Sequence, residues 1–215
     1  MAGQIKALLF DFGGVFTDSP FHVVADYAKE IGAEPADVAA VVFGSYEQDS
    51  EHTWHQLERG EISLEQARDH ILEAGARRDL EVDIYTLFGR MAGDPGTEAR
   101  QPLVDRVRGL RQAGYRTGII TNNVAEFGDG WRSLIPVEEL FEFVIDSSSV
   151  GVRKPDPRIF QLALAELGHP QPGACVFLDD FAANVEAARA LGMHGILVSP
   201  DVTEAIAELD GLLTE

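Results

Sequence analysis

The sequence ALLFDFGGV at residues 7–15 decides the fold class of this chain. Its four apolar residues run without alternation into Asp11, which is typical of a short strand buried on both faces. Similar strand-like runs follow at 118–121, 143–145, 175–178 and 196–198. Helical patterns separate them at 102–113, 157–167 and 182–191. This alternation predicts an α/β fold, a doubly wound parallel sheet with helices on both faces.

One long segment interrupts the alternation after the first strand. It contains no convincing strand, and amphipathic helical patterns occupy 22–31, 35–48, 63–75 and 80–91. Ser63 and Gln66 form the Ser-x-x-Gln pattern of a capping box, and Gly93-Asp94-Pro95-Gly96 is a turn-rich candidate hinge. We therefore expect a helical insertion over residues 18–96 and an α/β core made of residues 1–17 and 97–215.

Composition and charge exclude several classes of protein. The 215 residues are 45% hydrophobic and carry a formal net charge of −19, so the surface repels nucleic-acid phosphates and anionic lipid. No stretch approaches the roughly 20 apolar residues of a membrane span. Cys175 is the single cysteine, which excludes an intramolecular disulfide and fits a reducing compartment. We expect a soluble cytoplasmic protein with no nucleic-acid or membrane partner.

Polar residues gather where the predicted strands end or helices begin. They are Asp11, the pair Thr121-Asn122, Lys154, and the pair Asp179-Asp180. Ligands of an open parallel sheet bind at the carboxyl ends of its strands, so these side chains are expected at one edge. A carboxylate nucleophile, further carboxylates for a hard cation, a hydroxyl and an ammonium together suit phosphoryl transfer through an aspartyl phosphate.

These four motifs, in this order, resemble the haloacid dehalogenase superfamily. The resemblance is to its branch with a Rossmann-like core and a small helical cap inserted after the first strand, and it covers essentially the whole chain. The strings FDFGGV at 10–15 and GVRKPD at 151–156 are similar to one sub-branch. That sub-branch includes sugar-phosphate phosphatases and the phosphatase-like domains fused to acyl-CoA dehydrogenases.

The resemblance implies a role for each motif residue. The catalytic residues that it implies are Asp11, Thr121, Asn122 and Lys154. Asp11 is the implied nucleophile. The resemblance also implies a Mg²⁺ site, whose ligands are Asp11, the backbone carbonyl of Gly13, Asp179 and Asp180. Asp180 is expected to be a direct metal ligand, and Asp18 and Ser19 resemble the start of the cap linker. The implied substrate is a small phosphorylated metabolite.

Gly13 departs from the pattern of most phosphatases of this family. They carry a second Asp at this position as general acid and base, and a glycine has no side chain to protonate a leaving group. The leading hypothesis is a Mg²⁺-dependent phosphatase. The alternatives are a metal-independent 2-haloacid dehalogenase that uses Asp11, and a catalytically weak binding or regulatory domain. The family's dehalogenases carry Ser and Asn where this chain has Asp179 and Asp180. The substrate and the oligomeric state stay open.

Overall fold

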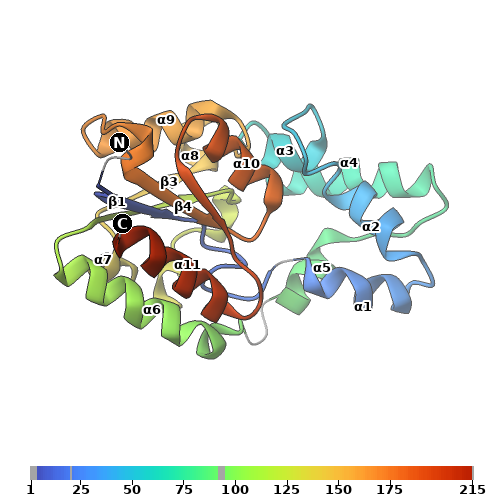
Figure 1. Ribbon diagram of the computed structural model, residues 1–215. Coiled ribbons are helices and arrows are strands. Elements are labelled where there is room, and N and C mark those ends of the chain that lie inside the picture. The colour runs from blue at the N-terminus through green and yellow to red at the C-terminus, as the bar shows by residue number, and fades with distance from the viewer. Residues whose placement is uncertain (1–3, 20, 92–94, 215) are drawn as a thin grey trace.

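Five parallel strands form one sheet in the order β3-β2-β1-β4-β5, with β1 in the centre (Figure 1). The computed structural model describes residues 4–19, 21–91 and 95–214. The strands are β1 (Ala7–Phe10), β2 (Arg116–Thr121), β3 (Phe143–Asp146), β4 (Cys175–Asp179) and β5 (His194–Leu197). Each strand lies on one of the predicted apolar runs, so the predicted α/β class and the parallel sheet are confirmed.

Helices cover both faces of this sheet, which explains why the middle of each strand is apolar. Leu8 and Phe10 pack into a cluster with α6 (Thr97–Gln112), α7 (Val137–Leu140) and α11 (Val202–Thr214). Ala7 and Leu9 point to the opposite face and pack with α9 (Pro157–Glu166) and α10 (Ala182–Ala190). The short α8 (Ser147–Val150) follows β3, and three 3₁₀ turns lie at Ala125–Phe127, Gly130–Ser133 and Pro172–Ala174. The sequence patterns do not predict α11, which packs along α6.

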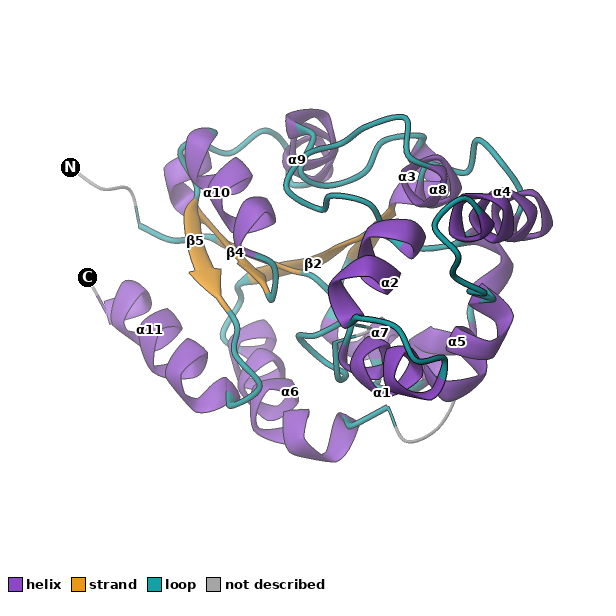
Figure 2. Cartoon of the chain, turned by 90° about the vertical axis from the view of Figure 1, so that its right-hand side faces the viewer, coloured by secondary structure: helices purple, strands orange, loops and turns teal. Residues whose placement is uncertain are grey.

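Five helices lie between β1 and α6 and extend beyond one end of the sheet (Figure 1). They are α1 (His22–Glu30), α2 (Pro35–Val42), α3 (Thr53–Glu58), α4 (Leu64–Ala76) and α5 (Ile84–Met91). Figure 2 looks at the molecule from the side of these helices. They bury a hydrophobic cluster of their own, which includes Val42, Leu57, Ile71 and Leu87. The division into a core and an insertion at 18–96 stays a prediction, and residues 20 and 92–94, with part of the candidate hinge, lie outside the described residues.

Two local features decide where the inserted helices begin and end. The capping box is confirmed: Gln66 N–H donates to Ser63 Oγ at 3.2 Å, and Ser63 N–H donates to Gln66 Oε1 at 2.9 Å. The predicted helix over 35–48 is too long, because it ends at Val42. Gly44 has a φ of +69°, a left-handed conformation that stops an α-helix, and a Cβ there would meet the His52 ring at 2.7 Å.

No helix in the described part of the chain is both long enough and apolar enough to cross a membrane.

His55 on α3 is a fully buried histidine. Its Nδ1 accepts a hydrogen bond from Ser50 N–H at 3.1 Å, so the ring carries its proton on Nε2 in the neutral form. Burial, followed by the positive charge of Arg153, lowers the pKa of His55 to about 3. The unfolded chain takes up this proton near the ordinary pKa of 6.5, whereas the folded chain does not.

The resulting prediction concerns the pH dependence of stability. Since the folded-state pKa is lowered, the contribution of His55 is complete above pH 6.5 and is lost as pH falls toward 3. Its contribution to the slope is at most about 1.4 kcal/mol per pH unit. Urea unfolding of His55→Gln at pH 7, 6 and 5 is expected to show a smaller acid-induced loss than the parent. The matched control is His70→Gln on the exposed face of α4. Equal slopes in both variants would contradict the assignment.

Candidate active site

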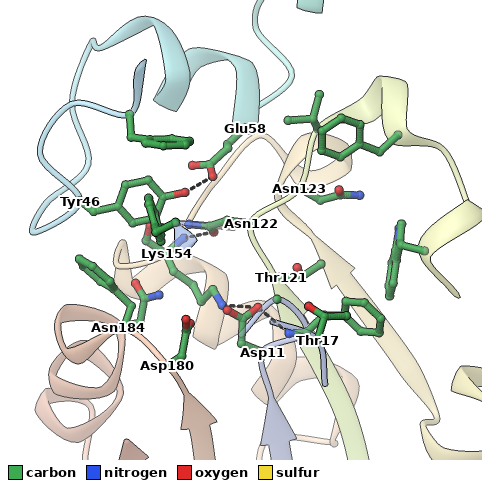
Figure 3. Close-up of a pocket in the computed structure, with 18 of the residues that line it drawn as sticks. Asp11, Thr17, Tyr46, Glu58, Thr121, Asn122, Asn123, Lys154, Asp180 and Asn184 are labelled. Carbon is green, nitrogen blue, oxygen red and sulfur yellow. Dashed lines mark hydrogen bonds and ion pairs between the residues drawn. The ribbon is translucent and has the colours of Figure 1, made fainter. Parts of the chain in front are cut away.

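A cavity of about 230 Å³ opens at the carboxyl ends of β1, β2 and β4 (Figure 3). Six of the predicted site residues line it, namely Asp11, Gly13, Thr121, Asn122, Lys154 and Asp180. Asp179, at the end of β4, is fully buried just behind this lining. The structure therefore brings all the predicted site residues together, although they come from four separate segments of the chain. The inserted helices and their loops contribute Phe43, Tyr46, Trp54 and Glu58 to the opposite wall.

The Lys154 ammonium joins two of the carboxylates. Its Nζ lies 2.7 Å from Asp11 Oδ1 and 2.7 Å from Asp179 Oδ2, and the side chain is fully buried. Burial alone would lower the pKa of Lys154, but the charges of Asp11 and Asp179 outweigh it and raise that pKa above its ordinary value. Lys154 is therefore a permanent cation at the floor of the cavity.

Asp179 uses its oxygens to hold neighbouring groups in place. Its Oδ1 accepts from Phe181 N–H at 2.8 Å, and its Oδ2 accepts from Lys154. The Asn184 amide nitrogen donates to both oxygens, at 3.1 and 3.0 Å. Asp179 thus fixes Lys154 and the start of α10, while Asp180 faces the cavity.

Asn122 also acts on Lys154. Its amide nitrogen donates to the Lys154 carbonyl at 3.1 Å, and its Oδ1 accepts from the Lys154 N–H at 2.7 Å. The side chain therefore clamps the backbone that carries the ammonium, in addition to lining the cavity. Thr121, the last residue of β2, is buried and also lines the cavity (Figure 3).

Gly14 allows the Asp11 loop to approach Asp180. Its φ is +76°, and a Cβ at this position would lie 2.0 Å from Asp180 Oδ2. Gly13, which lines the cavity, is not among the glycines with positive φ. Burial, with the charge of Asp179 second, raises the pKa of Asp180 to about 6. The two glycines thus differ in backbone conformation: position 14 needs glycine for its left-handed φ and for space beside Asp180, whereas the φ at position 13 is not left-handed.

The acidic cluster has the charge and the donor atoms for a divalent cation. Asp11, Asp179 and Asp180 each offer an oxygen within 4.8 Å of the others, and Lys154 is the single cation among the described lining residues. Three carboxylates against one ammonium leave two negative charges uncompensated. Burial, opposed by Lys154 and reinforced by Asp179 and Asp180, raises the pKa of Asp11 well above its ordinary value. The buried Asn184 Oδ1 has no hydrogen-bond partner among the residues that the structure describes, and an all-oxygen donor set suits a hard cation such as Mg²⁺.

A buried ion pair between Arg153 and Glu58 lies beside this site, and the sequence analysis gave neither residue a role. Arg153 is fully buried and its Nε donates to Glu58 Oε2 at 2.7 Å. Glu58 also accepts a hydrogen bond from the Tyr46 hydroxyl, and its backbone carbonyl accepts one from Ser147 Oγ at 2.6 Å. These contacts attach α3 to the sheet side of the cavity. No spacing pattern could reveal them, because Glu58 and Arg153 lie 95 residues apart.

The contact between Gly14 and Asp180 predicts an unusually costly glycine substitution. Gly14→Ala carries the roughly 1 kcal/mol of a left-handed alanine and also drives a Cβ into Asp180, an overlap that costs a further 1–3 kcal/mol or so. Gly168→Ala is the matched control, since Gly168 has a φ of +80° and nothing within 4 Å of its would-be Cβ. Chemical denaturation should show the larger loss of unfolding free energy for Gly14→Ala. Equal losses would mean that Asp180 moves aside freely.

Comparison with known proteins assigns this architecture to a family. The family model described as haloacid dehalogenase-like hydrolase matches residues 5–192. Mouse acyl-CoA dehydrogenase family member 10 is 31% identical over 97% of this chain, which spans 19% of that protein's length. Rat bifunctional epoxide hydrolase 2 is 28% identical over 96% of the chain, which spans 38% of that protein. Phosphatase MT3486 of Mycobacterium tuberculosis is 30% identical over 91% of this chain and 88% of its own length.

Solved structures agree with this assignment at the level of the fold. An HAD-like family hydrolase of Porphyromonas gingivalis has a TM-score of 0.68 at 24% identity, over 96% of this chain and 98% of that one. The L-2-haloacid dehalogenase RSc1362 has a TM-score of 0.66 at 18% identity, over 99% and 100%. With a family match over most of its length and the family's fold, the chain belongs to the haloacid dehalogenase-like hydrolases.

Proposed function

We propose that this hydrolase is a Mg²⁺-dependent phosphatase that acts on a small phosphorylated metabolite through an aspartyl phosphate on Asp11. The observation that carries the proposal is the uncompensated negative charge of three carboxylates around one lysine. Without a cation, the site would have to bury this charge or neutralise it by protonation, and the raised pKa values of Asp11 and Asp180 indicate that Lys154 alone does not balance it. Relatives named as phosphatases, among them MT3486 and a glyceraldehyde 3-phosphate phosphatase of Methanothermobacter thermautotrophicus, support it.

The side chains divide the reaction between them. An Asp11 carboxylate oxygen attacks phosphorus, the bond to the leaving oxygen breaks, and that oxygen departs with the bonding electron pair. Water then attacks the phosphorus of phospho-Asp11, which releases inorganic phosphate and restores the carboxylate. Lys154 and the Thr121 hydroxyl bind the phosphoryl oxygens while charge moves between them. Mg²⁺ would be held by Asp11, the Gly13 carbonyl, Asp180 and Asp179, and when bound it would supply the positive charge that lets phosphate approach the carboxylates.

We propose that residues 18–96 form the cap of this site. Phe43, Tyr46, Trp54 and Glu58 of this segment line the cavity, and the buried pair of Glu58 and Arg153 links it to the core. A cap in this position excludes water from the aspartyl phosphate and strengthens the electrostatic interactions around it.

The first prediction tests the nucleophile and the metal together. Phosphate release from p-nitrophenyl phosphate should require Mg²⁺ and stop in EDTA. Asp11→Asn should lower kcat at least about 1000-fold, because the neutral amide is not a nucleophile. The control is Asp156→Asn at the start of α9, where asparagine caps the helix equally well. EDTA-resistant release of halide from 2-chloropropionate would instead establish the dehalogenase alternative. Lack of both activities would favour a binding domain.

The second prediction concerns the missing acid at Gly13. The leaving oxygen departs largely unprotonated, so the first step should depend steeply on leaving-group pKa across aryl and alkyl phosphates. Gly13→Asp should flatten this dependence and speed up alkyl phosphates, because general acid catalysis contributes about 10²–10⁴-fold. The backbone allows this test, since Gly13 is not among the positive-φ glycines. A flat dependence in the parent enzyme would show that another side chain donates the proton.

A further inference from the structure

The walls of the cavity point to a substrate class. We propose that the substrate is the phosphate monoester of an apolar alcohol or phenol, whose carbon skeleton packs against aromatic side chains. The inference rests on the proposed phosphatase function and specifies what that phosphatase accepts. Three observations support it: the walls of the cavity are apolar, the polar donors in the walls already form hydrogen bonds within the protein, and the lysine that can receive a phosphate lies at the floor.

Aromatic side chains dominate the walls above the acidic floor. Eight of the chain's 18 aromatic residues line the cavity, and both tryptophans are among them. They are Phe12, Phe21, Phe43, Tyr46, Trp54, Phe127, Trp131 and Phe181. Several pack edge to face, with ring centroids 4.5 Å apart for Phe12 and Trp131 and 4.8 Å for Phe43 and Trp54. Figure 3 shows aromatic rings on both sides of the labelled polar residues. Such walls bind apolar carbon by burial from water.

The polar side chains in these walls already donate to partners within the protein. The Asn122 amide nitrogen donates to the Lys154 carbonyl, and that of Asn123 donates to Asp146 Oδ2 at 2.7 Å. The Trp54 indole N–H donates to the Tyr46 hydroxyl at 3.1 Å, and that hydroxyl donates to Glu58. Sugar hydroxyls could donate to the Asp18 and Glu58 carboxylates or to Asn184 Oδ1, but their own oxygens would have to compete for donors that these hydrogen bonds already use, and leaving a buried polar group unpaired is costly.

The charges in the cavity favour a single phosphate on a neutral skeleton. Lys154 is the one cationic side chain among the described lining residues, and it lies at the floor between Asp11 and Asp179. Asp18 and Glu58 are carboxylates elsewhere in the lining. A second anionic group, as in a bisphosphate or a phosphorylated acid, would face these carboxylates with no cation to receive it.

The size of the cavity limits the skeleton. An apolar cavity of about 150 Å³ holds benzene. The volume here is about 230 Å³, so one ring or a short branched chain fits beside the phosphate. Phe127 and Leu134, which are 40% and 39% exposed, continue the apolar lining toward solvent. A short tail on the ring would lie against them.

The decisive experiment uses 4-alkylphenyl phosphates, which lengthen the apolar tail while the leaving-group pKa stays nearly constant. From phenyl to 4-propylphenyl phosphate, kcat/KM should rise up to about fourfold per methylene until the cavity is full. Replacing the ethyl group of 4-ethylphenyl phosphate by a hydroxymethyl group should return kcat/KM to about the value for phenyl phosphate. 4-Carboxyphenyl phosphate should be a poor substrate although its leaving group is the better one.

A matched pair of variants locates the effect in the cavity. Leu134→Ser at the rim should lower kcat/KM for 4-butylphenyl phosphate about fivefold more than it lowers kcat/KM for phenyl phosphate. Leu162→Ser is the control, because Leu162 is 38% exposed on α9 and does not line the cavity. Equal effects of the two variants would overturn the assignment of the tail to this rim.

Binding without turnover gives an independent measurement. Both tryptophans line the cavity, so the fluorescence of Asp11→Asn should respond to 4-butylphenyl phosphate at lower concentrations than to glucose 6-phosphate. Phosphate release that is indifferent to the tail, or that prefers glucose 6-phosphate, overturns the apolar class and leaves the phosphatase function standing. No phosphate release from any ester, with unchanged fluorescence, overturns both.

Discussion

The buried ammonium of Lys154 is the interaction on which the rest of the site depends. A fully buried lysine is stable only when its charge is paired, and here Asp11 and Asp179 pair it at 2.7 Å each. Asp11 directly follows β1 and Asp179 is the last residue of β4, and these two strands are neighbours in the sheet. Asn122, directly after β2, holds the backbone of the same lysine. One cation thus fixes the ends of three adjacent strands relative to each other.

The same arrangement separates chemistry from recognition within one cavity. The charged groups lie on the sheet side, where short loops after rigid strands hold them in place. The aromatic groups lie largely on helical and loop segments that only pack together in the folded chain. In the proposed function, apolar walls would keep the local dielectric low and strengthen the attraction between Lys154 and a bound phosphate. The buried pair of Arg153 and Glu58 holds the two sides together.

In the loop that follows Asp11, the adjacent residues Gly13 and Gly14 are under different structural constraints. Gly14 is required by its left-handed φ and by the Asp180 carboxylate against it. Gly13 does not have a left-handed φ, and it lines the cavity. The glycine at position 14 therefore reflects the geometry of the loop, whereas a left-handed φ does not account for the glycine at position 13. A family that includes both phosphatases and dehalogenases can change reaction at such positions without changing its fold.

The sequence by itself determined the α/β class, the five strands and the gathering of the motif residues. Local rules are sufficient there: uninterrupted apolar runs mean strands covered on both faces, and parallel strands bring their carboxyl ends to one edge. Only the tertiary structure decided that Asp179 and Asn122 hold Lys154, that Glu58 pairs with Arg153, and that eight aromatic residues line one cavity. Short α3 and the early end of α2 also escaped the sequence analysis, since a six-residue helix has too few turns to show a period. These features depend on contacts between residues far apart in the chain, which no local spacing encodes.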